Sequence, residues 1–88
     1  PTSYGLEQNY PNPFNPLTVI RYSLPVGGLV TLKVYNVFGQ EIATLVNETQ
    51  DAGYKSASWD ATNVPSGMYF YKITAGQFSD VKKMLMIK

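Results

Sequence analysis

Apolar and polar side chains alternate along most of this chain. In residues 18–24, Ile20, Tyr22 and Leu24 share one face of an extended segment, while polar side chains occupy the other face. Residues 30–34 repeat the same pattern. A period of two residues indicates a β-strand with one buried face, because successive side chains of a strand point to opposite sides.

Further segments extend this pattern and divide the chain into short elements. We predict strands at residues 41–46, 54–59, 68–74 and 77–88, and a weaker strand at residues 6–10. Turns or polar loops separate them at residues 25–28, 47–53 and 60–66. No segment carries the apolar stripe of an amphipathic helix. The sequence therefore predicts an all-β fold, an antiparallel immunoglobulin-like β-sandwich of about seven strands in two sheets.

Aromatic and branched side chains must hold such a sandwich together, because the chain has no cysteine and so no disulfide. We expect Trp59 near the centre of the core. The side chains expected to be mostly buried are Ile20, Tyr22, Leu32, Val34, Trp59, Tyr69, Tyr71 and Ile73.

The pattern does not choose the inward face of the last strand. Met84 and Met86 share one face, and Leu85 and Ile87 share the other. Both faces are therefore apolar. Such a strand is either enclosed at the edge of the sandwich or presents one face to a partner.

Length and composition indicate one folded domain. The chain has 88 residues, 44% of them apolar, which is too short for two cores and too apolar for a disordered tail. We assign residues 6–88 to the domain. Residues 1–5 are interpreted as the remnant of a linker, because the chain begins without methionine and resembles a piece of a longer protein.

Charge and reactive groups argue against nucleic-acid binding and catalysis. The net charge is +1, and histidine and cysteine are both absent. The absence of these residues removes thiol nucleophiles, the usual zinc ligands and the usual general base near neutral pH. No apolar run approaches the ~18 residues of a membrane-spanning helix. We therefore expect a domain that is not an enzyme and holds no cofactor or metal.

Two weaker hypotheses about ligands stay open. Asp60 with Asn63 could bind calcium, although an Asx-turn after a strand is the simpler interpretation. Tyr35, Phe70 and Phe78 fall on the expected outer face and could stack on sugars, although aromatic residues are common on strands for packing alone.

The segment at residues 10–16 is rich in proline. Proline lacks a backbone N–H, so this segment cannot form a central strand. We expect it to make a stiff extended turn, with Tyr10 and Phe14 anchoring it over an open end of the sandwich.

Several blocks together resemble a known family. They are residues 10–16, 18–25, 30–39, 66–71 and 82–88. In this order they resemble the type A C-terminal sorting domain of type IX secretion cargo, and they are also similar to the immunoglobulin-like module of hook-capping proteins.

The resemblance implies a non-catalytic export address on a larger protein. Such domains carry an N-terminal passenger from the periplasm through an outer-membrane translocon, with the help of shuttle proteins, to the cell surface or the medium. A sortase-like peptidase at the surface commonly removes them. The alternative is an immunoglobulin-like structural spacer or a carbohydrate-binding accessory module of an extracellular enzyme.

The resemblance also implies which residues the secretion machinery recognises. Pairing of a partner with the edge of the last strand is a possible mode of recognition. By motif, the recognition residues are Pro11, Asn12, Pro13, Gly67, Tyr69, Lys82, Lys83, Met84, Leu85, Met86, Ile87 and Lys88.

Overall fold

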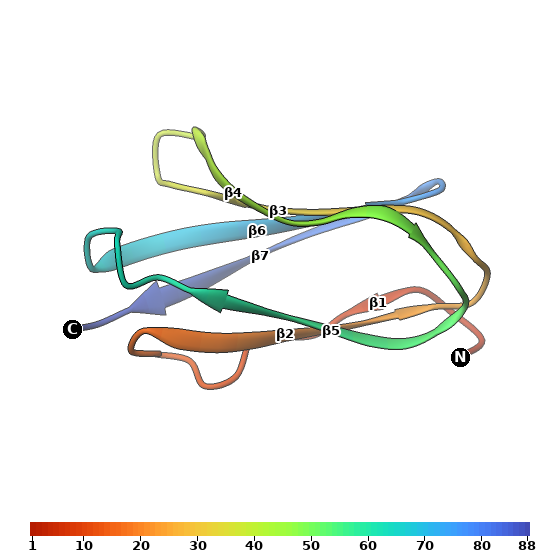
Figure 1. The fold of residues 1–88 in the computed structure, drawn as a ribbon, viewed down its shortest axis with the longest axis horizontal. Coiled ribbons are helices and arrows are strands. Elements are labelled where there is room, and N and C mark those ends of the chain that lie inside the picture. The colour runs from red at the N-terminus through yellow and green to blue at the C-terminus, as the bar shows by residue number, and fades with distance from the viewer.

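Two antiparallel sheets stack face to face to form the molecule (Figure 1). The computed structural model describes all 88 residues. Its strands are β1 (Gly5–Leu6), β2 (Leu17–Leu24), β3 (Gly28–Tyr35), β4 (Glu41–Gln50), β5 (Gly53–Asp60), β6 (Gly67–Ala75) and β7 (Phe78–Met86). One sheet has the order β1-β2-β5 and the other β4-β3-β6-β7. The predicted seven-stranded all-β sandwich is confirmed.

The two ends of the chain lie at opposite ends of the long axis (Figure 1), which measures 37 Å. β7 ends, and β2 and β6 begin, at the same end of the sandwich; we call this the C-terminal end. The structure contains no helix that is long and apolar enough to cross a membrane.

A cluster of sixteen buried apolar side chains fills the space between the sheets. All eight side chains that the sequence predicted to be buried belong to it. Trp59, expected near the centre of the core, lies instead at its C-terminal end, where its ring is tilted against Phe14 at 5.8 Å and meets the edge of Tyr69 at 5.3 Å. Such aromatic pairs add about 0.5–1.5 kcal/mol beyond the burial of their surface.

The structure settles the inward face of the last strand. Met84 and Met86 are fully buried, whereas Leu85 and Ile87 are exposed. The reason is the register of β7 with β6, which places Met84 opposite the buried Tyr69.

The predicted loop at residues 47–53 is wrong. β4 continues to Gln50 and pairs with β3 over its whole length. Polar side chains do not prevent backbone pairing here, because β4 is an edge strand and its C-terminal half is largely exposed to solvent. Two register shifts between β3 and β4 also interrupt the alternation that a regular strand would show.

Three aromatic side chains also differ from expectation. Tyr10 is 73% exposed, so of the two expected anchoring rings only that of Phe14 enters the core. Tyr54, in the predicted strand at residues 54–59, is exposed and does not point into the core. Phe78 follows the turn after Ala75 on the inner side of β7 and stacks on Tyr4 with ring centroids 5.1 Å apart. Phe78 therefore does not share an outer face with the other proposed sugar-stacking rings.

Candidate functional site

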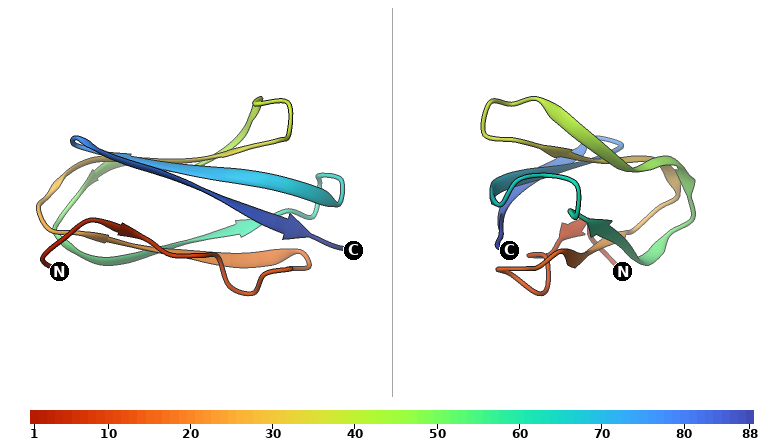
Figure 2. Two further views of the ribbon diagram at one scale, coloured as in Figure 1. Left: turned by 180° about the vertical axis from the view of Figure 1, so that it is seen from behind. Right: turned by 60° about the vertical axis from the view of Figure 1, so that its left-hand side comes forward.

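The proline-rich segment lies along the C-terminal half of β7. Phe14 forms a parallel bridge with Met86: the Phe14 N–H donates to the Leu85 carbonyl at 3.0 Å, and the Ile87 N–H donates to the Phe14 carbonyl at 2.9 Å. Figure 2 shows this segment bulging below β2 near the C-terminal end. We call residues 8–16 the strap, because they tie the start of the chain to its last strand.

Two side chains of the strap extend this contact along the outer edge of β7. The Asn12 side-chain oxygen accepts the Leu85 N–H at 3.0 Å. The Gln8 amide donates to the Lys83 carbonyl at 2.7 Å. The sequence suggested that β7 offers an open edge, but these backbone groups already have partners. A strand that added to this part of β7 would have to displace the strap.

A buried polar cluster holds the strap in place. The Tyr71 hydroxyl donates to the Glu7 carbonyl at 2.7 Å and accepts the Asn9 N–H at 2.8 Å. The Asn9 amide donates to the Thr18 hydroxyl at 2.9 Å and to the Pro11 carbonyl at 3.1 Å. Burial raises the pKa of Tyr71 to about 12. No buried side-chain nitrogen or oxygen lacks a hydrogen-bond partner, so the cluster is internally satisfied.

The backbone of the strap has an unusual course, since the peptide bonds before Pro11, Pro13 and Pro16 are all cis. The ring of Phe14 is only 1% exposed and packs against Trp59. The expected role of Phe14 as an anchor of this segment is confirmed. Asn9, Thr18 and the Tyr71 hydroxyl, which form the buried cluster, were not among the residues that the motifs indicated.

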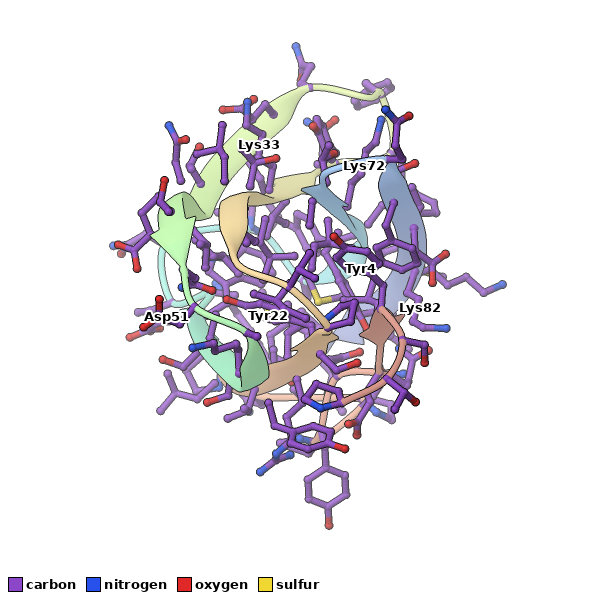
Figure 3. All side chains as sticks on the ribbon, turned by 90° about the vertical axis from the view of Figure 1, so that its right-hand side faces the viewer. Tyr4, Tyr22, Lys33, Asp51, Lys72 and Lys82 are labelled. Carbon is purple, nitrogen blue, oxygen red and sulfur yellow. The ribbon has the colours of Figure 1, made fainter.

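The terminal lysines do not form one patch. Lys82 lies on the inner side of β7 and is half-buried, whereas Lys83 lies on the outer side, opposite Phe70. Figure 3 shows Lys82 at the margin of the sandwich, away from Lys33 and Lys72. The Lys88 ammonium donates to the Thr62 carbonyl at 3.3 Å. A partner that read all three lysines would have to contact several sides of the C-terminal end.

Gly67 and Tyr69 lie beside the end of β7. Gly67 is opposite Met86, with a φ of +145°, and a Cβ added there would meet no atom within 4 Å. Tyr69 is buried, and its hydroxyl donates to the Pro65 carbonyl. An open cleft of about 270 Å³ adjoins them; its lining includes Val37, Phe38, Ile42, Val64, Pro65 and Met68.

The candidate calcium ligand Asp60 is engaged within its own loop. One of its carboxylate oxygens accepts the Thr62 N–H at 2.9 Å and also the Thr62 hydroxyl. These hydrogen bonds lower the pKa of Asp60. The simpler interpretation from the sequence, an Asx-turn after the strand, is confirmed.

The sequence motifs thus meet in space at one end of the molecule. The strap, the start of β6 and the end of β7 lie side by side there, although most of the chain separates the strap from the other two. A comparison with curated protein sequences finds no significant match. The family model described as "Secretion system C-terminal sorting domain" matches residues 8–88. Because this match runs from the start of the strap through β7, the chain belongs to the family of C-terminal sorting domains of type IX secretion.

Proposed function

We propose that this domain is a non-catalytic export address, which directs a larger passenger through the outer-membrane translocon of a type IX secretion system. Family membership supports a sorting signal and implies a passenger in the same chain. In this proposal the passenger crosses the periplasm, meets the shuttle proteins and the translocon, and reaches the cell surface or the medium.

The proposed location of the surface that the secretion machinery recognises rests on the backbone bridge between Phe14 and Met86. Because the strap is bonded to β7, the machinery meets a folded composite surface and not a loose terminal peptide. The parts of this surface come from Asn12, Gly67 and the exposed side chains of residues 83–88. The motif residues that we propose for recognition are Pro11, Asn12, Pro13, Gly67, Tyr69, Lys82, Lys83, Met84, Leu85, Met86, Ile87 and Lys88.

Burial divides these residues into two roles. Met84, Met86 and Tyr69 are buried, so they act by holding the surface in shape. Leu85 and Ile87 are exposed and available for direct contact. Mutations in the first group should therefore reduce export in step with stability, and mutations in the second should reduce export alone.

We also propose where a surface peptidase would separate the domain from its passenger. Residues 1–3 are exposed, whereas Tyr4 stacks on Phe78 and Gly5 pairs with Ser23. A peptidase needs an extended, accessible segment. The proposed linker is therefore accessible only before Tyr4.

The test is delivery of a reporter in a bacterium with a type IX secretion system. The domain is fused to the C-terminus of a periplasmic reporter, and surface delivery and melting temperature are measured for each variant. The variants are Lys82→Ala, Lys83→Ala, Lys88→Ala and Leu85→Ser, with Arg21→Ala and Lys55→Ala on the other sheet as controls. Substitutions at the exposed positions should change stability by only about 0.5 kcal/mol, and the melting temperature measures any larger effect at the half-buried Lys82 and Lys55.

We expect the variants at the C-terminal end to lower delivery while the melting temperature holds, and the controls to deliver normally. Equal delivery by all variants would show that the signal lies elsewhere. Delivery that falls only in step with the melting temperature would show that the C-terminal end is scaffold. Normal delivery of a reporter without the domain would favour the structural-spacer alternative.

A further inference from the structure

The outer face of the four-stranded sheet carries cations beside aromatic rings. The register places Lys33 opposite Lys72 and Tyr35 opposite Phe70, and Phe70 in turn lies opposite Lys83. These positions alternate with the buried residues of β3 and β6, so their side chains point away from the core. Figure 3 shows Lys33 and Lys72 projecting from the same side of the sheet.

Two of these three lysines have no acidic partner. Lys33 contacts the Glu41 carboxylate at 3.2 Å, which is the only ion pair in the molecule, and this contact lowers the pKa of Glu41. Lys72 and Lys83 have no carboxylate within 4.0 Å. Glu41 already offsets the charge of Lys33, so Lys72 and Lys83 are the cations of this face that an acidic partner could pair with.

The same face also exposes aliphatic side chains. Val81 lies opposite Lys72, and Leu85 lies opposite Met68; all three apolar side chains are exposed. The outer face of the smaller sheet also exposes apolar side chains, Leu17 and Tyr54, but its cation Arg21 shares that face with the carboxylate of Asp60. An excess of positive charge beside exposed apolar groups is therefore a property of the larger sheet.

We propose that this face docks an acidic polypeptide surface, whose carboxylates lie on Lys72 and Lys83 and whose aliphatic side chains cover Val81 and Leu85. Charge complementarity selects an acidic partner. The exposed aliphatic side chains favour a protein partner, which has aliphatic side chains of its own to cover them. A glycan is less favoured, because Phe78 packs on Tyr4 and only Tyr35 and Phe70 are left on this face to stack on sugar rings. Lys83 and Leu85 also belong to the proposed recognition surface, whereas Lys72 and Val81 do not. Binding is measured on the isolated domain, without export, so its failure would leave the sorting proposal intact.

The test is titration of the ¹⁵N-labelled chain with a short synthetic peptide of glutamate and leucine, followed by amide chemical shifts. A peptide of glutamate and serine, phosphatidylglycerol vesicles and polygalacturonate are the comparison ligands. The variants are Lys72→Glu and Lys83→Glu, and Lys72→Gln serves if charge reversal impairs folding. The matched control is Arg21→Glu, which makes the same charge change at an exposed position on the smaller sheet.

We expect the glutamate–leucine peptide to shift amides of β3, β6 and β7, and to bind more weakly as salt is added. Lys72→Glu and Lys83→Glu combined in one chain should weaken binding of this peptide by about tenfold, which corresponds to about 1.4 kcal/mol. Arg21→Glu should not weaken it. Equal binding of the serine peptide would show a merely ionic contact and overturn the proposal. Tighter binding of vesicles or polygalacturonate, or shifts centred on β2 and β5, would also overturn it.

Discussion

Tyr71 holds the chain at Glu7 by donating its hydroxyl hydrogen to the Glu7 carbonyl oxygen at 2.7 Å, across a separation of 64 residues. The same hydroxyl accepts the Asn9 N–H. A side chain from the middle of the large sheet thus fixes the backbone immediately before the proline-rich loop. The shape of the surface around β7 therefore depends on the core, although the residues on that surface come from one loop and the ends of two strands.

Replacing Tyr71 by phenylalanine should destabilise the domain by about 1–3 kcal/mol, because the buried Asn9 N–H and the Glu7 carbonyl would each lose their hydrogen-bond partner. Amide hydrogen exchange at Asn9 should speed up more than exchange within β5. Tyr35→Phe is the matched control, since Tyr35 lies on the outer face opposite Phe70 and its hydroxyl makes no hydrogen bond within the chain. A Tyr71→Phe variant as stable as Tyr35→Phe would contradict this role.

The same hydroxyl predicts a loss of stability in alkali. The pKa of Tyr71 rises from its ordinary value of 10.0 to about 12 in the folded state, because burial disfavours the phenolate. Between these two values the unfolded chain releases the proton and the folded chain keeps it, so the free energy of unfolding falls as pH rises. The stabilisation is complete below pH 10.0 and lost above about pH 12.

Denaturation midpoints measured across this alkaline range test the prediction. Burial also raises the pKa of Tyr22 and of Tyr69, which act in the same direction. Tyr71→Phe should therefore flatten the dependence on pH without abolishing it. A midpoint that rises with pH in this range would show that the sign is wrong.

The sequence predicts the sandwich well because its strands are half-buried and their alternation records which face is inside. It predicts the first part of β4, residues 41–46, but misses residues 47–50, because these polar residues of an edge strand pair through their backbone and carry no apolar pattern. It also leaves the inner face of β7 undecided, since Leu85 and Met86 are both apolar and only the register with β6 distinguishes them.

The candidate site is predictable only in part, and for a related reason. Motifs indicated the strap and the end of β7 separately, but nothing in the sequence shows that Phe14 bonds to the backbone beside Met86. Asn9 and Thr18 give no local signal, because their role is to satisfy each other and Pro11 inside the fold. Contacts of this kind depend on the three-dimensional path of the chain.

Phe14 should contribute as much to stability as a residue of the central core. Phe14→Ala removes a ring that is 1% exposed and packed on Trp59, so we expect a loss of about 3–5 kcal/mol. Trp59→Ala should cost a similar amount. Phe38→Ala is the control, because Phe38 is 84% exposed and should change stability by no more than about 0.5 kcal/mol. Urea unfolding that gave Phe14→Ala and Phe38→Ala the same midpoint would show that the strap is not anchored by this ring.

Gly67 and Gly28 allow the effect of backbone conformation on stability to be separated from the effect of steric crowding. A Cβ added at either position meets no atom within 4 Å, but Gly67 has a φ of +145°, which residues with a side chain rarely adopt. Gly67→Ala should therefore destabilise the domain by about 1–3 kcal/mol, whereas Gly28→Ala should leave stability unchanged or slightly raised. Thermal unfolding of the two variants measures the difference, and equal melting temperatures would contradict a purely conformational requirement at Gly67.

Delivery of the reporter by Gly67→Ala then shows whether this position also serves recognition. Ile73→Val shortens a fully buried side chain of the same strand and should cost about 0.5–1.5 kcal/mol, which overlaps the loss expected for Gly67→Ala without touching the C-terminal end. The added methyl group of Gly67→Ala points into open space beside Met86, where it would obstruct a partner. We therefore expect Gly67→Ala to reduce surface delivery more than Ile73→Val does at comparable stability. Equal delivery by the two variants would assign Gly67 to the fold alone.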